Sequence, residues 1–443
     1  MFYLTYNILS IFLLFPVCLY HLYRSVSRGR PPALAERFGF IPSASLKKIA
    51  DRPVIWLHAV SVGESIAARP LLTALRRHYP DHAIVISNTT ETGRSVAAGF
   101  PEADLCIYFP FDFLPAVRSI LTRIRPSLII VMETEIWPNF TRAAHQHGIP
   151  LILANGRISD RSFDGYLRFR WFFSHALEHF SLLCMQTDVD HERIIAIGAP
   201  ADRVITIGNL KYDIPFRQVG ADEKSRMREL YAIPEGVTVL TAGSTHAGEE
   251  QYLIDTYREL LLTIDNLFLI LVPRHPERAD EVSVLLERSG LGFRRRTGLP
   301  QGGEFKAGEI LLVDTIGEMM NLYALADVAF VGGSLAPTGG HNLLEPASVG
   351  VACVFGPHMA NFREIAELVL QYGAGIQVKT SQELTDSCMA LITSAELRQV
   401  LGQNGLKLMR DNGGATGKHM EIIIAHLPAT DAKPDNSSIC LTT

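Results

Sequence analysis

Short apolar runs alternate with helical stretches along most of this chain, and the alternation occurs twice. The first series of apolar runs lies at residues 53–59, 83–89, 105–111, 127–134 and 150–156. The pattern pauses between residues 209 and 226 and then resumes, with runs at residues 237–244, 267–274, 309–315, 328–334 and 351–357. Each run ends in glycine or polar residues, which is typical of parallel strands separated by helices. The sequence therefore predicts an α/β protein with two doubly wound parallel sheets.

The domain boundaries follow from where this pattern starts, pauses and stops. The predicted parts are a membrane anchor at 1–23, a basic juxtamembrane segment at 24–52, a first domain at 53–210, a linker at 211–226, a second domain at 227–427 and a disordered tail at 428–443. Ligands of such sheets bind beyond the carboxyl ends of the strands. We therefore expect the functional residues just after each strand, in two domains that face a cleft.

The amino-terminal segment has the composition of a membrane-spanning helix. Residues 1–23 contain no Asp, Glu, Lys or Arg, and a helix of about 20 apolar residues is long enough to cross a bilayer. Arginines at positions 24, 28 and 30 follow, which places the rest of the chain in the cytoplasm. A cleaved signal peptide is the alternative, but the segment lacks a basic start and a small-residue cleavage site.

Charge and cysteine content exclude several classes of protein. The formal net charge of −5 argues against a nucleic-acid-binding protein, because such proteins usually carry a basic excess. Six cysteines lie far apart without a CxxC motif, which fits a reducing compartment without structural zinc or disulfides. The strand ends carry neither a DxD pair nor a Gly-x-x-x-x-Gly-Lys loop. We therefore expect neither a metal ion nor another cofactor.

The glycine-rich stretch Val331–Ala347 is the strongest candidate for a phosphate site. It leads from an apolar run into a helix start near Asn342, and helix starts offer free N–H groups and a partial positive charge. Glu345, one turn further on, suits a sugar or ribose hydroxyl better than an anion. The alternative is a simple turn in which Glu345 interacts with the helix dipole.

Two acidic strand ends stand out in the first domain. Ser61, Gly63 and Glu64 open the first helix, where they could hold an acceptor hydroxyl with Glu64 as general base. A carboxylate at this position is also common as a helix-terminal charge. Glu133 and Glu135 flank a threonine after the fourth apolar run and predict a polar edge beside apolar surface.

Polar residues also follow the strands of the second domain. Ser244, Thr245 and His246 end one apolar run, and Arg274 ends the next, where it could bind a phosphate or carboxylate. The turn at residues 316–318 follows the third run, where its backbone groups could contact a nucleotide base.

Four motifs occur together behind the predicted anchor: VSVGE at 60–64, METEIWPN at 132–139, PRHPER at 273–278 and GGSLAPTGGHNLLEPA at 332–347. In this order they resemble the 3-deoxy-D-manno-octulosonic acid (Kdo) transferases of lipopolysaccharide assembly, over nearly the whole chain up to about residue 425. The resemblance implies an inverting glycosyltransferase of the GT-B type, with two Rossmann-like domains. It also implies transfer of Kdo from CMP-Kdo to the lipid A precursor, lipid IVA, at the cytoplasmic face of the inner membrane.

The same resemblance assigns roles to individual residues. It makes Glu64 the proton acceptor. It assigns CMP binding to Pro273, Arg274, Ile316, Gly317, Glu318, Asn342, Leu343, Leu344 and Glu345. Two alternatives stay open: a nucleotide-sugar epimerase, which would not need the anchor, and a membrane-tethered nucleotide-binding scaffold, which the many strand-end carboxylates disfavour.

Overall fold

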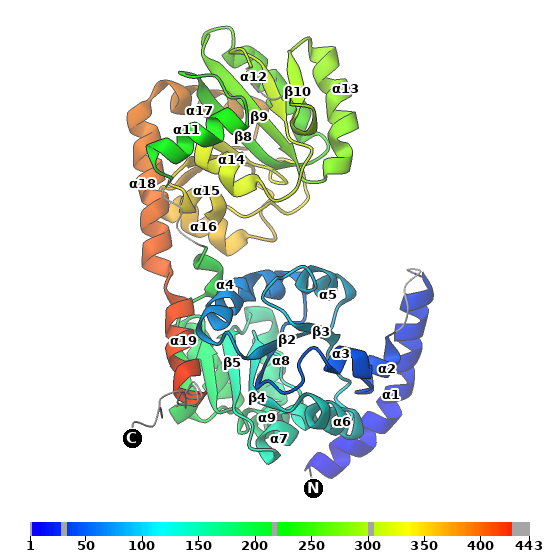
Figure 1. The fold of residues 1–443 in the computed structure, drawn as a ribbon. Helices are drawn as coiled ribbons and strands as arrows, with labels where there is room; N and C mark the ends of the chain where they lie inside the picture. The colour runs from blue at the N-terminus through cyan, green and yellow to red at the C-terminus, as the bar shows by residue number, and fades with distance from the viewer. Residues whose placement is uncertain (1, 28–32, 215–218, 300–304, 428–443) are drawn as a thin grey trace, which may run out of the picture. The chain divides into compact units, whose positions relative to one another are not determined.

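The computed structural model describes residues 2–27, 33–214, 219–299 and 305–427. It divides into two compact units, the first formed by Met1–Asp213 with Gly413–Thr443 and the second by Ile214–Asn412 (Figure 1). Within the described residues, each unit contains one seven-stranded parallel sheet. The predicted α/β fold with two doubly wound sheets is confirmed.

The sheet of the first unit has the strand order β3-β2-β1-β4-β5-β6-β7. Its strands are β1 (Val54–His58), β2 (Ala83–Asn88), β3 (Leu105–Tyr108), β4 (Pro126–Met132), β5 (Leu151–Gly156), β6 (Leu182–Met185) and β7 (Val204–Thr206). Every residue of β1, β2 and β5 is buried, as expected for a parallel sheet covered on both faces. The strand order reverses between β1 and β4, so their carboxyl ends form the switch point at which such sheets bind ligands.

Helices connect these strands, and some of them begin at side-chain caps. They are α2 (Leu34–Arg37), α3 (Ser43–Leu46), α4 (Val62–His78), α5 (Glu91–Ala97), α6 (Leu114–Ile124), α7 (Pro138–Gln146), α8 (Asp160–Arg168), α9 (Arg170–Leu177) and α10 (Asp188–Ile197), with 3-10 turns at Ala201–Arg203 and Leu210–Tyr212. Ser61, Thr90 and Thr187 cap α4, α5 and α10 by accepting a backbone N–H. The amino-terminal helix α1 (Phe2–Ser27) precedes them.

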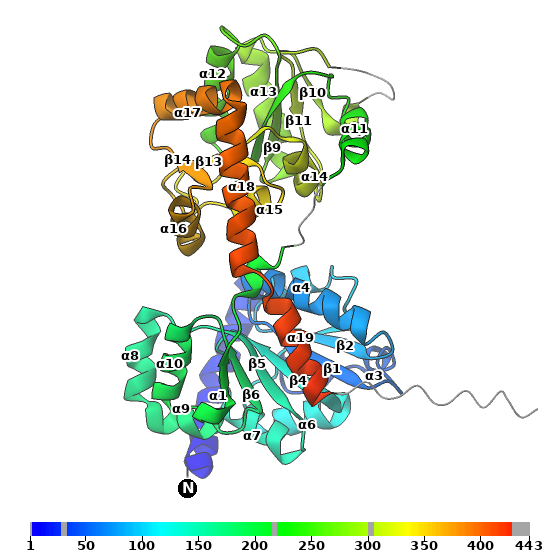
Figure 2. The same cartoon turned by 90° about the vertical axis from the view of Figure 1, so that its left-hand side faces the viewer.

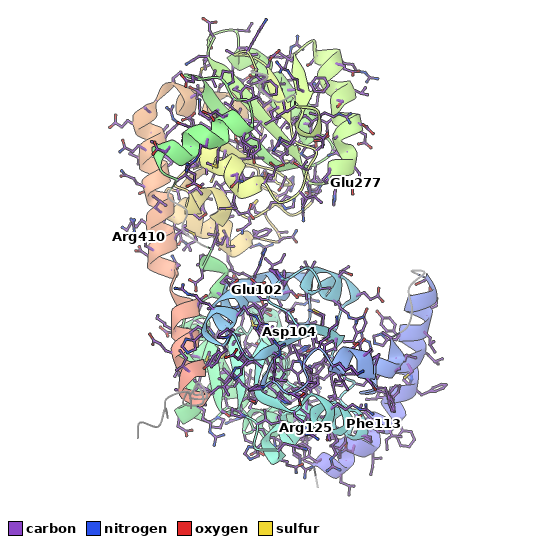
Figure 3. The ribbon with its side chains drawn as sticks, in the orientation of Figure 1. Glu102, Asp104, Phe113, Arg125, Glu277 and Arg410 are labelled. Atoms are coloured by element: carbon purple, nitrogen blue, oxygen red, sulfur yellow. The ribbon has the colours of Figure 1, made fainter. Side chains whose placement is uncertain are left out.

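Ion pairs hold the amino ends of the strands in this unit. Arg52, just before β1, pairs with Asp104, just before β3, at 2.6 Å, and Arg76 of α4 pairs with the same carboxylate. Nearby, the hydroxyl of Thr73 donates to Glu102 at 2.8 Å. Figure 3 labels both acidic residues on the first unit. These contacts lie at the opposite end of the strands from the switch point, so we assign them to stability and not to ligand binding.

The second unit repeats the architecture, with strand order β10-β11-β9-β8-β12-β13-β14. Its strands are β8 (Thr238–Thr245), β9 (Leu267–Pro273), β10 (Phe293–Arg295), β11 (Ile310–Leu312), β12 (Val328–Val331), β13 (Ala352–Phe355) and β14 (Gly375–Gln377). Its helices are α11 (Ala221–Leu230), α12 (Glu249–Leu260), α13 (Ala279–Ser289), α14 (Met319–Leu325), α15 (Leu344–Ser348), α16 (Arg363–Gln371), α17 (Ser381–Thr393) and α18 (Ala395–Asn412), with 3-10 turns at Pro276–Arg278 and Arg296–Gly298. The switch point lies between β8 and β12.

The carboxyl-terminal boundary differs from the prediction of a second domain at 227–427. Helix α19 (Ala415–His426) belongs to the first unit and packs beside α4 (Figure 2). Its residues Ala415, Met420 and Ile423 are buried in the core of that unit, and Asp213 accepts the N–H of Gly414 at 2.6 Å. The apolar face of α19 is complementary to the first sheet, which the sequence pattern does not reveal.

Two further boundaries complete the comparison with the sequence. Helix α11 starts at Ala221, inside the stretch 211–226 that was predicted as a linker. The predicted disordered tail, 428–443, lies outside the described residues.

Candidate active site

Glu64 is fixed at the carboxyl end of β1 by groups from its own turn. Ser61 caps α4, and its hydroxyl oxygen accepts the Glu64 N–H at 3.3 Å. In return, the Glu64 carboxylate accepts the Val60 N–H at 2.8 Å and the Ser61 hydroxyl at 2.9 Å. This reciprocal arrangement is a variant of the capping box. Because Glu64 is only 8% exposed, its carboxylate has one orientation at the switch point.

Three carboxylates share this edge of the first sheet. Burial raises the pKa of Glu64, the Val60 hydrogen bond lowers it, and the charge of Glu133 raises it again. The pKa of Glu135 is raised to about 7, mainly by burial and also by the charges of Glu64 and Glu133, against a decrease from the hydrogen bond of Trp137. The structure therefore brings these predicted residues together. Groups with raised pKa values can accept and release protons near neutral pH.

Backbone strain marks several of the strand ends. Glu133 has a φ of 52°, Asn155 of 57° and Ser244 of 56°, all in the left-handed region that non-glycine residues rarely adopt. Such conformations cost on the order of 1–3 kcal/mol each and cluster at functional sites. Glu133 follows β4, Asn155 lies at the end of β5 and Ser244 near the end of β8. Their positions support the assignment of function to both carboxyl edges.

A group of histidines gathers around Arg274 in the second unit. The rings of His246 and His341 stack with centroids 5.1 Å apart, and their Nε2 atoms lie 2.8 Å apart. His275 meets His246 edge-on at 6.2 Å. The pKa of His341 is lowered to about 4, mainly by burial and then by the nearby charges of Arg274, His246 and His275. Their lowered pKa values leave His246 and His341 uncharged near neutral pH, so the positive charge that favours an anionic ligand here is that of Arg274.

His275 and His341 were missed by the sequence reasoning. Both lie inside motifs that were singled out, directly beside Arg274 and Asn342. Only their proximity in space to His246 distinguishes them from surface histidines.

The first part of the glycine-rich stretch holds a protein carboxylate. Fully buried Glu249 accepts N–H groups from four successive residues, at 2.7, 2.9, 2.8 and 3.2 Å: Gly333, Ser334, Leu335 and Ala336. These N–H groups cannot also bind a phosphate, so that part of the predicted phosphate site is wrong. The candidate region is reduced to Asn342–Glu345, where the N–H of Leu344 already bonds to the Asn342 side chain at 3.1 Å.

Glu345 and Arg274 form the second charged centre. The pKa of Glu345 is raised to about 7, because the increase from burial exceeds the decrease from the positive charge of Arg274. Arg274 itself is exposed. A carboxyl with a pKa near neutrality can bind a hydroxyl group, and an exposed guanidinium can bind an anion. Arg274 and Glu345, which the sequence had assigned to one site, thus lie close enough for the charge of Arg274 to affect the pKa of Glu345.

The turn after β11 presents its backbone rather than its carboxylate. Ile316 is 84% exposed, and Gly317 has a φ of 90°. Glu318 accepts hydrogen bonds from Thr315 and from Arg296, the latter at 3.2 Å. Although burial raises the pKa of Glu318, hydrogen bonds from Thr315, Tyr231 and Arg296 lower it. Its carboxylate is therefore occupied within the protein.

Thr245 and Pro273 are also structural in this unit. Thr245 is fully buried and donates to Glu250 at 3.0 Å, and Glu250 pairs with Arg278 at 2.6 Å. Pro273 ends β9 and is buried. Their contribution to a ligand is restricted to backbone atoms.

A cavity of ≈ 560 Å³ opens beside residues 337–339 of the glycine-rich stretch. Its polar lining comes from Thr338, His358, Asn361, Arg363, Glu367 and Gln377. The Asn361 side chain donates to the Thr338 carbonyl at 3.3 Å, and the Asn361 N–H donates to the Gly339 carbonyl at 2.9 Å. The glycine-rich stretch therefore contributes His341 to the histidine cluster and residues 337–339 to this cavity.

Comparisons with known proteins agree on one family. A sequence profile of 3-deoxy-D-manno-octulosonic-acid transferases (kdotransferases) matches residues 32–214. The 3-deoxy-D-manno-octulosonic acid transferase of Haemophilus influenzae is 34% identical over 396 residues, or 89% of this chain and 91% of that protein. The solved C-terminal CMP-Kdo binding domain of WaaA from Acinetobacter baumannii is 34% identical, covers 43% of this chain and 97% of its own, and has a TM-score of 0.39.

A more distant likeness concerns the fold alone. The UDP-GlcNAc 2-epimerase of Neisseria meningitidis covers 84% of this chain and 100% of its own, with 15% identity and a TM-score of 0.54. The two parallel seven-stranded sheets of this chain have the GT-B-like arrangement of elements. Because the identity to the Haemophilus enzyme extends over nearly all of both chains, this protein belongs to the 3-deoxy-D-manno-octulosonic acid (Kdo) transferase family and is a glycosyltransferase of lipopolysaccharide synthesis.

Proposed function

We propose that this protein is an inverting transferase that moves Kdo from CMP-Kdo to a hydroxyl of lipid IVA, with Glu64 as general base. The observation that carries the proposal is the state of the Glu64 side chain. It is buried, it is oriented by Val60 and Ser61, and burial together with Glu133 raises its pKa. A carboxylate with a raised pKa is a stronger base than a solvated one.

The reaction needs one proton transfer and one bond exchange. Glu64 accepts the proton of the lipid hydroxyl as the hydroxyl oxygen attacks the anomeric carbon of Kdo. The bond between that carbon and the CMP phosphate oxygen breaks, and CMP leaves with the electron pair. Attack on the face opposite the leaving group inverts the anomeric configuration. The proton remains on Glu64 until solvent removes it.

CMP is held in the second unit. Arg274 pairs with the phosphate, and its charge stabilises the negative charge that grows on CMP as the bond breaks. Asn342–Glu345 contacts the ribose, and the exposed turn 316–318 contacts the base through Ile316 and backbone groups. The leaving group carries a single phosphate, so the arginine can balance its charge without a divalent ion.

The sugar acid of the donor fits the cavity beside the glycine-rich stretch. Kdo is an anionic sugar, and Arg363 is a cation among hydrogen-bonding side chains at that cavity. Arg363→Ala should raise the KM for CMP-Kdo while leaving the affinity for CMP alone unchanged. The control is Arg410→Ala, at an exposed arginine on α18 (Figure 3). An equal loss of CMP affinity would contradict this placement of the sugar.

The acceptor connects the proposed reaction with the inner membrane, because lipid IVA is anchored there by its acyl chains. Helix α1 exposes an apolar surface, so we place it in the inner membrane and both units on the cytoplasmic side. The sequence favours a single crossing by α1, whereas its contacts with the first unit favour a helix that lies in one leaflet.

A product assay tests the function directly. Purified protein is incubated with CMP-Kdo and lipid IVA, and the lipid is analysed by mass spectrometry. We expect a mass increase of one or more Kdo units together with stoichiometric release of CMP. Conversion of the sugar nucleotide in the absence of lipid would instead indicate an epimerase and would contradict the proposal.

A further inference from the structure

Helix α1 has one face that contacts the first unit and an opposite face that is exposed. The half-buried positions recur every three or four residues and so share one side of the helix: Phe2, Tyr3, Tyr6, Asn7, Ser10, Leu14, Cys18 and His21. The exposed positions are mainly large and apolar, among them Leu4, Ile8, Ile11, Phe12, Phe15 and Leu19. The contact face is thus largely polar, and the exposed face is apolar.

Specific contacts join this polar face to the first unit along the length of the helix. The hydroxyl of Tyr6 donates to Asp112 at 2.7 Å, and the hydroxyl of Tyr3 donates to the His175 carbonyl at 2.8 Å. Near the other end of the helix, the ring of His21 lies 5.4 Å from that of Phe111. Figure 1 shows α1 running along the side of the first unit past α2.

These contacts are incompatible with a helix that crosses the bilayer. From Tyr3 to His21 the helix rises about 27 Å, nearly the thickness of the hydrocarbon layer. A crossing helix would carry the surface of the first unit that contacts it through the membrane. That surface includes Asp112 and Arg142, whose guanidinium lies 4.2 Å from the Tyr3 ring centroid. Charged side chains at that depth are costly.

We propose that α1 is a monotopic helix that lies in the plane of the cytoplasmic leaflet, with its apolar face among phospholipid acyl chains and its polar face on the first unit. This replaces the single membrane crossing expected from the sequence. An apolar face exposed to lipid and a polar face turned away from it are what an in-plane helix requires.

Residues at the junction of α8 and α9 extend the proposed lipid-facing surface. The ring of Trp171 is 62% exposed and lies 6.0 Å from that of Phe2, and Phe169 is 49% exposed. Arg168 and Arg170 are exposed beside them. Tryptophan with arginine is typical of the interface, where the ring lies at headgroup depth and the guanidinium meets lipid phosphate. The charge therefore favours an anionic bilayer over a second copy of this chain as the occupant.

The contacts of α1 also reach the acidic edge of the candidate active site. The Asn139 side chain donates to Asn7 at 2.8 Å, and the backbone N–H groups of Asn139 and Phe140 donate to Asp112 at 3.0 and 2.8 Å. These residues begin α7, a few positions after Glu135. The leaflet that receives α1 is thus next to the segment that carries Glu135, so an acceptor held in that leaflet has a short path to it.

Protease protection of an amino-terminal epitope tests the orientation in the full-length protein. An in-plane helix leaves both termini in the cytoplasm, so protease should remove the amino-terminal tag in inverted vesicles and not in spheroplasts. A carboxyl-terminal tag on the same protein is the control and should behave identically. Removal of the amino-terminal tag in spheroplasts would overturn the proposal.

A pair of tyrosine variants tests the docked helix itself. Tyr6→Phe removes the hydroxyl that bonds to Asp112, whereas Tyr20→Phe alters a tyrosine that is 56% exposed. In lipid nanodiscs, Tyr6→Phe should lower the Tm of the first unit by roughly 2–4 °C and Tyr20→Phe should leave it unchanged. Equal Tm values for the two variants would contradict the docking.

Lipid contact is measured with vesicles of phosphatidylethanolamine and phosphatidylglycerol that carry brominated acyl chains. Bromine near the headgroups should quench the fluorescence of Trp171, and Trp171→Phe should abolish that part of the quenching. If the protein is a stable dimer without lipid and its Trp171 is not quenched when the vesicles are added, a second copy covers the apolar face, which would overturn the proposal.

Discussion

At the scale of single residues, Glu64 combines a structural and a chemical task. Its carboxylate completes the cap of α4 through Val60 and Ser61, and the same contacts orient it as a base. The cap alone does not explain why Glu64, Glu133 and Glu135 lie close enough for their charges to raise the pKa values of Glu64 and Glu135. Like charges at one strand end destabilise the fold, so their grouping points to chemistry.

Replacing Glu64 by Gln should separate these tasks. The amide oxygen can still accept a hydrogen bond, but the base is lost, so turnover should fall by roughly two to four powers of ten. Ser61→Ala is the control, because it weakens the cap by about 1 kcal/mol and keeps the carboxylate. Steady-state assays and Tm values of both variants give the comparison. Turnover of Glu64→Gln within about threefold of wild type would exclude Glu64 as the base.

Arg274→Ala should weaken CMP binding in the second unit. A charge-assisted hydrogen bond to phosphate contributes on the order of 1.5–3 kcal/mol, which is roughly 10- to 150-fold in Kd. Isothermal titration calorimetry measures the change. Arg288→Ala removes an exposed arginine from the same unit and should have no effect. If both variants bind CMP like the wild type, the phosphate lies elsewhere, with Ser244 the next candidate.

The half-buried carboxyl of Glu135 should make the first unit less stable as the pH rises. Its folded pKa of about 7 is above the ordinary value of 4.5, so its favourable contribution is complete below 4.5 and is lost as the pH rises through 7. Glu135→Gln does not titrate and should therefore raise the Tm at pH 8 by a few degrees, with little change at pH 5.

Tryptophan fluorescence reports this transition, because all three tryptophans (Trp56, Trp137 and Trp171) belong to the first unit. Glu277→Gln, at an exposed position labelled in Figure 3, is the control. A Tm difference that is the same at both pH values would show that Glu135 does not carry the effect.

At the scale of elements, α19 belongs to a different unit from the helix that precedes it in the chain. The helix follows α18 of the second unit directly, yet it completes the core of the first. His419 of α19 also accepts the N–H of Asn155 at 3.2 Å, at one of the strained strand ends. The last helix thus supports the backbone geometry at the carboxyl end of β5.

Ile423→Ala should destabilise the first unit and leave the second intact. Ile423 is fully buried, and truncation of such a residue costs about 2–5 kcal/mol. Urea unfolding followed by tryptophan fluorescence measures the first unit, and CMP affinity measures the second. Glu421→Ala on the exposed side of α19 is the control. A loss of CMP affinity with unchanged fluorescence would assign α19 to the second unit instead.

At the scale of the whole molecule, each unit supplies one part of the proposed reaction. The first unit carries buried carboxylates with raised pKa values, and the second carries an arginine among histidines. A base and an anion site are what an acceptor hydroxyl and a nucleotide leaving group require.

Activity should survive chelation with EDTA, with a loss of no more than about twofold. The leaving group has one phosphate, which Arg274 can neutralise. Among the described residues, no group of three or more His, Cys, Asp or Glu side chains could hold a metal ion. Rates are measured on metal-free substrate with and without EDTA. A complete loss of activity that Mg²⁺ restores would show that the donor binds with an ion.

The sequence by itself determined the elements and the residues at their ends. Apolar runs bounded by glycine and polar residues located β1, β4, β8 and β9, because strand and helix periodicity are local properties of the chain. The rule that ligands bind at the carboxyl ends of parallel strands then selected Glu64, Glu135 and Arg274. Their grouping in each unit was predictable for the same reason.

Only the tertiary structure decided which polar groups remain available to a ligand. Glu249 captures N–H groups more than 80 residues away along the chain, His246 pairs with His341, and α19 returns to the first unit. The role of the polar face of α1 likewise becomes clear only from its contact with the first unit, where the Tyr6 hydroxyl donates to Asp112. Such contacts depend on how distant segments pack, and a local sequence pattern carries no information about which partner a buried polar group finds.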